Sequence, residues 1–134
     1  MKAMIQYFSI FSLVLGWFSL LGQPSTDVWL FDLDQDGKLF VPRNISDNPG
    51  YDNQPSFTRD GEQILFASTR NEQTDIISYR VSDASKTWLT STPGGEYSPT
   101  QIPNSDEFSA VLLQTDGRQL LWKYSLEGNR GSIA

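Results

Sequence analysis

Short apolar runs separated by turn residues make up the chain from about residue 27 onward. Five runs of six residues each are rich in aliphatic and aromatic side chains, and glycine, proline or asparagine stands in the segments between them. No segment has a sustained helical period. The pattern therefore predicts an all-β chain of short antiparallel strands, expected at 28–33, 63–68, 76–81, 108–113 and 120–125.

A stretch of the sequence returns after 44 positions, because residues 44–55 resemble residues 88–99. A partial third copy, 27–31, precedes the related segment 75–79 by 48 positions. A period of this size is typical of stacked small sheets, and it favours a β-propeller over a sandwich or a barrel. The matches include Ile45 with Leu89, Ser46 with Thr90, Asp52 with Glu96, and the identities Pro49, Gly50 and Pro55.

The chain is too short for a closed ring. One four-stranded blade takes about 40 to 45 residues, and residues 23–134 therefore provide about two and a half blades. We assign the repeats to about 27–46, 47–90 and 91–126, with two outer strands in the first, a whole blade at 54–90 and three strands at 98–125. The sequence thus predicts an incomplete β-propeller, interpreted as a fragment of a larger one.

The first residues differ from the rest. Lys2 is followed by an apolar stretch at about 5–21 that serine and glycine interrupt, and Gly22 follows it. This layout predicts a signal peptide at 1–22, a mature chain at 23–134 without a stable membrane span, and a periplasmic or secreted location. An uncleaved membrane anchor is the alternative, which the diluting serines disfavour. Gln23 stands where a lipid-modified cysteine would be.

The composition excludes several classes of site. The chain has no cysteine and no histidine, so it lacks disulfides, thiol nucleophiles, serine–histidine triads and ordinary zinc sites. Nucleotide-binding glycine motifs are also absent from the sequence. Without the leader, nine basic residues face sixteen acidic ones, a net charge of −7 that argues against nucleic acid as a partner. We therefore expect neither enzymatic activity nor a cofactor.

The sharpest cluster of candidate ligands is an acidic loop. Asp32, Asp34 and Asp36 alternate before Gly37, as at the start of a calcium loop. The closing carboxylate is missing, because position twelve of such a loop would be Arg43. The segment is therefore interpreted as a hairpin turn, with calcium binding as the alternative.

Aromatic residues have two possible uses. Most fall at strand positions, where we expect them to fill the blade core rather than form a ligand platform. Tyr51 and Tyr97 are expected in loops before the inner strands and are the first candidates for contact with a partner. The expected core aromatics are Trp29, Phe31, Phe57, Phe66, Tyr79, Trp88, Trp122 and Tyr124.

Residues 55–61, Pro-Ser-Phe-Thr-Arg-Asp-Gly, resemble the Pro-x-Phe-Ser-Pro-Asp-Gly signature of the WD-like repeats in TolB-type β-propellers. Arg59 departs from the usual proline, and in the second copy Gln101 replaces the expected aromatic residue. Segment 75–79 is similar to the Asp-Ile-Tyr pattern of a third strand.

This resemblance implies an exported, noncatalytic propeller module that binds a protein or a cell-envelope component. Two alternatives remain open. One is the propeller portion of a prolyl oligopeptidase-type serine peptidase whose catalytic domain lies elsewhere, and the other is a saccharide-binding propeller.

Overall fold

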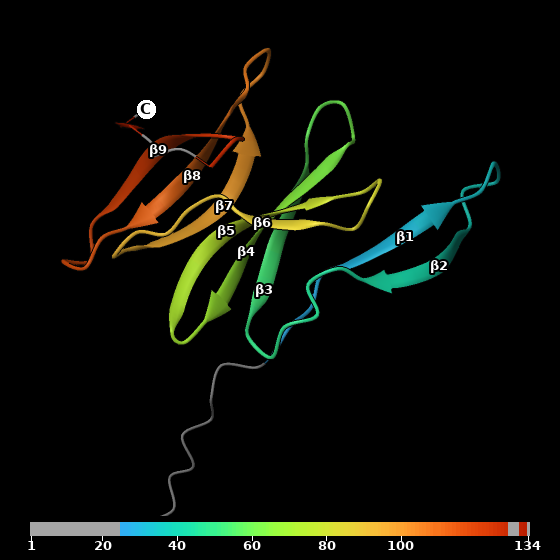
Figure 1. Cartoon of the computed structure of the whole chain (residues 1–134), viewed down its shortest axis with the longest axis horizontal. Helices are drawn as coiled ribbons and strands as arrows, with labels where there is room; N and C mark the ends of the chain where they lie inside the picture. The colour runs from blue at the N-terminus through green and yellow to red at the C-terminus, as the bar shows by residue number, and fades with distance from the viewer. Residues whose placement is uncertain (1–24, 129–131, 134) are drawn as a thin grey trace, which may run out of the picture.

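The computed structural model describes residues 25–128 and 132–133. These residues form ten β-strands in three antiparallel sheets, and the described part of the chain contains no helix (Figure 1). The predicted all-β class is therefore confirmed. The strands are β1 (Trp29–Leu33), β2 (Leu39–Asn44), β3 (Asp52–Phe57), β4 (Gln63–Arg70), β5 (Gln73–Arg80), β6 (Lys86–Trp88), β7 (Gly95–Gln101), β8 (Glu107–Leu113), β9 (Gln119–Ser125) and β10 (Ser132–Ile133).

The sheets follow the repeat. The first sheet is the hairpin β1–β2, the second has the order β3-β4-β5-β6, and the third has the order β7-β8-β9-β10. The three strands expected at 98–125 are β7, β8 and β9, and a fourth strand that was not expected, β10, follows that range and pairs with β9 through Ser132 opposite Lys123. The two residues of β10 are too few to produce a periodic sequence signal, whereas the longer apolar strands were predicted correctly.

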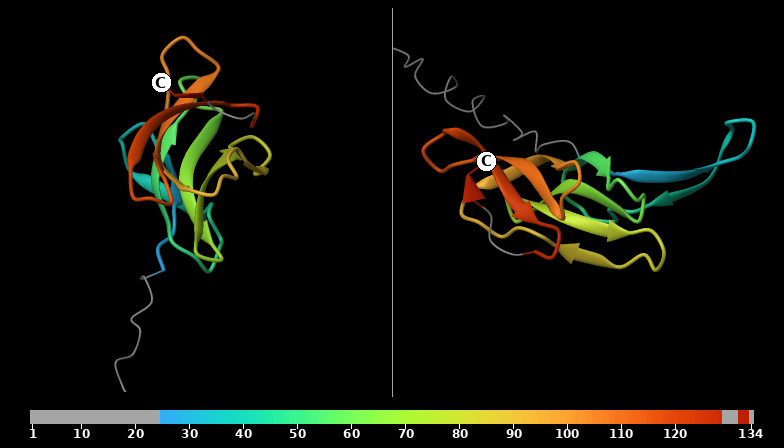
Figure 2. Two further views of the ribbon diagram at one scale, coloured as in Figure 1. Left: turned by 90° about the vertical axis from the view of Figure 1, so that its left-hand side faces the viewer. Right: turned by 90° about the horizontal axis from the view of Figure 1, so that it is seen from above.

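The three sheets stand side by side in chain order, and the first projects away from the other two (Figure 2). Strand β7 contacts β3, β4 and β5, so the third sheet packs on the second, while Val28 and Ile45, which flank β1 and β2, pack on the opposite face of the second sheet. We call the contact between the first and second sheets the first junction, and the contact between the second and third sheets the second junction. A partial propeller is the architecture that results.

The inner strands β3 and β7 each contain a bulge at the same repeat position. The register shifts between Asn53 and Ser56 in β3, and between Tyr97 and Thr100 in β7. Gln54 and Ser98 lie within the bulges with positive φ angles of 53° and 54°. The Ser98 backbone N–H donates to the Gln54 side-chain oxygen at 2.8 Å, so the two bulges are joined across the second junction.

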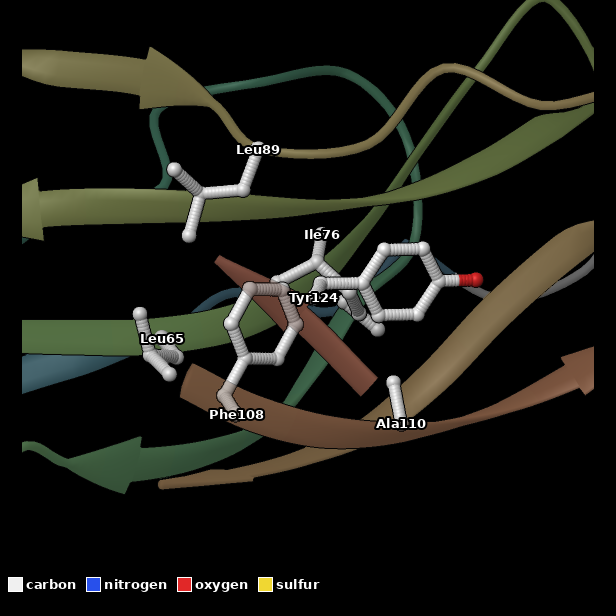
Figure 3. Packing of buried hydrophobic residues seen from close by; sticks show 7 residues of the cluster. Leu65, Ile76, Leu89, Phe108, Ala110 and Tyr124 are labelled. Atoms are coloured by element: carbon white, nitrogen blue, oxygen red, sulfur yellow. The ribbon is translucent and has the colours of Figure 1, made fainter. Parts of the chain in front are cut away.

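Strands β4 and β5 are buried on both faces, because the first junction covers one face and the second junction covers the other. In the second junction, one face of these strands meets the third sheet (Figure 3). The Phe108 and Tyr124 rings stack there with centroids 5.3 Å apart. The cluster comprises Leu65, Ala67, Ile76, Leu89, Phe108, Ala110 and Tyr124.

The opposite face of β4 and β5 packs on the first sheet. Val28 and Ile45 meet Ile64, Phe66 and Ile77 there, and Tyr79 completes the buried cluster. Alternation along the strands assigns each side chain to one junction, so Leu65 belongs to the second and Phe66 to the first.

Three aromatic residues expected in the core are exposed instead. Trp29 and Phe31 are 52% and 41% exposed, and Phe57 is 58% exposed. The first sheet has only two strands, and Val28 and Leu30 occupy its covered face, so Trp29 and Phe31 point the other way. Phe57 ends the inner strand β3. Among the other expected core aromatics, Phe66, Tyr79 and Tyr124 are buried, and Trp88 and Trp122 are partly buried.

Candidate functional site

Two cavities are lined by equivalent loops of the repeat, the loop before β3 and the loop before β7. The first has a volume of about 600 Å³ and is lined by the loop 48–51 and by the turn between β4 and β5. The second, of about 580 Å³, is lined by the loop 88–94 and by the ends of β8 and β9. Both fall within the volume range of small-molecule sites. The repeat thus places a concave surface beside the loop that precedes each of the inner strands β3 and β7.

A glycine allows each loop to approach the neighbouring strand end. A Cβ atom on Gly50 would collide with the backbone oxygen of Thr69, and one on Gly94 would lie 2.5 Å from the backbone oxygen of Leu113. The two glycines are identities of the repeat. Their presence at 50 and 94 is therefore explained by a close backbone contact.

The linings of the two cavities differ in charge. Arg70 and Glu72 line the first cavity, whereas no charged side chain lines the second. At the position equivalent to Arg70 the second cavity has Gln114, whose side-chain oxygen is buried and has no hydrogen-bond partner among the described residues. The indole nitrogen of Trp122 is also buried and has no hydrogen-bond partner among the described residues. The second cavity thus has no charged side chain in its lining, and two polar atoms of that lining lack hydrogen-bond partners.

Buried carboxyl groups lie behind the wall of the second cavity. Glu96 at the start of β7 is fully buried, and Asp75 on β5 is 2% exposed. Glu96 Oε1 accepts hydrogen bonds from the Thr92 and Tyr124 hydroxyls, the latter at 3.3 Å. Because Thr92 and Tyr124 also line the cavity, the buried acid is one hydrogen bond away from its surface.

Burial controls the protonation of this group. Removal of Glu96 from water, reinforced by the negative charge of Asp75, raises its pKa from an ordinary value of 4.5 to about 7. Burial likewise raises the pKa of Asp75, although a hydrogen bond from the Thr90 hydroxyl opposes the shift. Burial and the nearby Glu96 also raise the pKa of Tyr124.

The first junction holds a related network around Asp52, which is the repeat equivalent of Glu96. The Asn48 amide donates to both oxygens of Asp52, at 3.4 and 3.5 Å, and also to Ser68. Burial raises the pKa of Asp52, while hydrogen bonds from Ser68 and Asn48 act in the opposite direction. Asp27 and Ser46 form the counterpart of Asp75 and Thr90, joined at 3.1 Å.

The acidic loop forms the predicted hairpin. Asp34 Oδ1 accepts from the backbone N–H groups of Asp36 and Lys38, and Asp32 pairs with Arg43 at 2.6 Å. Within residues 25–128, no three His, Cys, Asp or Glu side chains are grouped as they would be around a metal ion. Asp32 and Asp34 are therefore engaged in the turn and the strand pair, and the structure adds no support for calcium.

Of the two tyrosines expected in loops, only one lies at a cavity. Tyr51 precedes β3 and lines the first cavity. Tyr97 lies within β7 and packs against the core of the second junction, so its assignment to a loop is wrong. The apolar pattern missed β7 because its sequence, Gly-Glu-Tyr-Ser-Pro-Thr-Gln, is mostly polar.

Sequence reasoning did not identify the Asp75–Glu96 pair. The one hint in the sequence was that an acidic residue occupies the same repeat position twice, at Asp52 and Glu96. Both side chains are buried in the structure. Since Glu96 is fully buried, it has no exposed atom with which to exchange a proton directly with a substrate. The arrangement can store a proton inside the junction and present a neutral concave surface in front of it.

No family model and no curated protein matches the sequence. A solved structure of a protein assigned as TolB from Agrobacterium tumefaciens is similar in fold, with a TM-score of 0.62 and 21% identity over 78% of this chain. This chain spans only 40% of that structure's length. The likeness establishes a TolB-like, all-β propeller fold and leaves the activity of the chain to be inferred from its own site.

A membrane-crossing helix is not found among the residues that the structure describes.

Proposed function

We propose that this chain is part of an exported, noncatalytic β-propeller module that binds a protein or another cell-envelope component. The binding surface in this proposal is the end of the sheets that carries the two cavities. The recurrence of a cavity beside the equivalent loops 48–51 and 88–94 is the observation that carries it, because successive hollows along a repeat form an extended concave face. The TolB-like fold supports the choice of a binding module.

A neutral saccharide is a second candidate ligand class, favoured by the second cavity alone. Its lining has no charged side chain and combines the Trp122 and Tyr124 aromatic residues with threonine hydroxyls. A sugar hydroxyl can both donate and accept, which suits a site with an unpaired amide oxygen and an unpaired indole N–H. Both groups are buried, so a small side-chain rotation would have to accompany binding.

Site-specific photo-cross-linking in the producing cell tests the proposed face. A photoreactive residue at exposed Asn71 or Thr115, on the rims of the two cavities, should give a discrete cross-linked product. The matched control positions are Asp83 and Asp106, which are exposed in turns at the opposite ends of the strands. Equal cross-linking at both ends, or none at either, would contradict the proposal.

Export is tested separately by the intact mass of protein recovered from the same cells. We expect a mature chain that starts near Gln23. Recovery of the chain with Met1 retained would contradict export without affecting the test of the binding face.

A further inference from the structure

The hydrogen bonds around Glu96 leave one of its oxygen atoms without a donor. Oε1 accepts from Thr92 and Tyr124, but no N–H or O–H group of the described residues donates to Oε2. The carboxyl that acts on Glu96, by its charge and as a hydrogen-bonding group, is Asp75 on β5 of the adjacent sheet, and β5 contacts β7. Two ionised carboxylates cannot hydrogen-bond, because both are acceptors only.

The positive charge that acts on the pair is on Arg70, and it opposes the rise in the pKa of Asp75 only as the weakest of the contributions. Besides Asp75 and Tyr124, the charged or titratable group that acts on this site is Arg70, whose guanidinium stacks on the Trp88 ring at 3.5 Å. The sequence contains no histidine that could supply a proton near neutral pH. A buried carboxylate with an unpaired oxygen is costly, and a proton removes both the charge and the missing hydrogen bond.

We propose that Asp75 and Glu96 share one proton across the second junction, and that loss of this proton loosens the packing of the third sheet on the second. The proton resides on the Glu96 carboxyl, which donates through Oε2 to Asp75. Asp75 lies on β5 and Glu96 on β7, so the hydrogen bond directly joins the two sheets. Ionisation replaces that bond with repulsion between two buried negative charges.

The first junction shows how the same position is satisfied without a shared proton. Asp52 receives two N–H contacts from the Asn48 amide, and Ser68 also bonds within the network. The equivalents of Asn48 and Ser68 are Thr92 and Leu112, which offer one hydroxyl and no hydrogen-bonding group. In the second junction the Thr92 and Tyr124 hydroxyls both reach Oε1, so Oε2 is the position that the shared proton fills.

The titration of Glu96 falls in a physiological range. Because folding raises its pKa to about 7, the folded chain binds more protons than the unfolded chain between about pH 4.5 and 7. Its contribution to stability is complete below pH 4.5 and is lost as the pH rises through about 7. The moving parts would include Thr92 and Tyr124, so the shape of the second cavity should follow the same titration.

Hydrogen exchange of the full chain at pH 5 and pH 8 tests the proposal, with rates corrected for the intrinsic effect of pH. In the wild-type chain, segment 89–97 should lose at least tenfold in protection between the two conditions, while segment 45–53 of the first junction should change less. One pKa unit corresponds to a tenfold change in the equilibrium between open and closed forms. Glu96→Gln should abolish the difference between the segments, because its amide donates to Asp75 without titrating.

Asp52→Asn is the matched control in the first junction and should leave the pH response of segment 89–97 intact. An infrared band of a protonated carboxyl at neutral pH, present in the wild type and absent from Glu96→Gln, would support the proton directly. If Glu96→Gln does not fold, Asp75→Asn provides a second variant whose amide can donate to ionised Glu96 and should also remove the response. A wild-type chain without the carboxyl band, or without a pH response in segment 89–97, would overturn the proposal.

Discussion

The two junctions are built on one plan but stabilise their buried acids differently. In each, a carboxyl residue lies at the start of the inner strand, the loop before that strand carries a proline and a glycine, and a hydroxyl of the preceding repeat donates to an aspartate of that repeat. In the first junction, the Asn48 amide donates to the Asp52 carboxylate. In the second, the Thr92 and Tyr124 hydroxyls donate to the Glu96 carboxyl, which also faces the acid Asp75.

This difference shows that two copies of a repeat can keep the same buried position for an acid while the pKa of that acid differs. Asp52 and Glu96 are 1% and 0% exposed, yet only Glu96 has its pKa raised to about 7. Burial alone therefore does not determine the charge of these sites. The removal of each carboxyl from water raises both pKa values; the charge of Asp75 adds to the rise at Glu96, whereas hydrogen bonds from Ser68 and Asn48 oppose it at Asp52.

The largest effect should come from removing the aromatic stack of the second junction. Phe108→Ala deletes a fully buried ring that packs on Tyr124, and we expect a loss of about 3–5 kcal/mol of unfolding free energy. Phe66→Ala should cost a similar amount in the first junction. Only Phe108→Ala should also reduce the dependence of stability on pH, because it disturbs the tyrosine that bonds to Glu96. Urea unfolding at pH 5 and pH 8 measures both effects, and equal pH responses would contradict this distinction.

A methyl group on the loop glycine should also be destabilising. Gly94→Ala places Cβ against the backbone oxygen of Leu113, so the loop must move away from β8 at a cost of about 1–3 kcal/mol. Gly95→Ala is the matched control, because its Cβ would meet only Thr74 at 3.8 Å. Thermal unfolding of the two variants should separate them by several degrees. Similar melting temperatures would show that the close approach at Gly94 is not required.

Exchange of one repeat residue should make the second junction resemble the first. Thr92→Asn introduces the amide donor that Asn48 provides to Asp52, and the new N–H group should favour ionised Glu96 and lower its pKa. Each unit by which the pKa falls restores about 1.4 kcal/mol of stability at pH 8. Denaturant unfolding between pH 5 and pH 8 should therefore become flatter, while Ser91→Asn, one position earlier, should retain the wild-type slope. An unchanged slope in Thr92→Asn would indicate that donor number is not the controlling variable.

The smallest effect concerns the equivalent residues Arg70 and Gln114. Arg70→Met removes the cation that stacks on Trp88 and should cost about 0.5–1 kcal/mol. Gln114→Met removes a buried amide oxygen that has no partner, so it should be neutral or slightly stabilising. Opposite signs in the unfolding free energies would confirm the contrast between the two cavity walls, whereas equal losses would contradict it.

The sequence predicted the sheets better than it predicted the site. Repeat spacing and runs such as Ile64–Ala67 are local, and they predicted the strands that are buried on two faces. The inner strands β3 and β7 were harder to recognise, because Pro55, Pro99 and several polar residues occupy their exposed or bulged positions. The Asp75–Glu96 pair depends on three strands and a loop meeting in space, so spacing along the chain could not predict it.

The paired positions at 52 and 96 have a consequence for how such a chain can grow during evolution. The second and third repeats each carry a strand with the buried acid, and the first and second repeats each carry an aspartate and a hydroxyl that face the acid of the next copy. Duplication of one coding segment therefore creates a neighbour that is already complementary to its parent. Later substitutions at single contact positions, such as 48 and 92, can then give each copy its own chemistry while the duplicated architecture is retained.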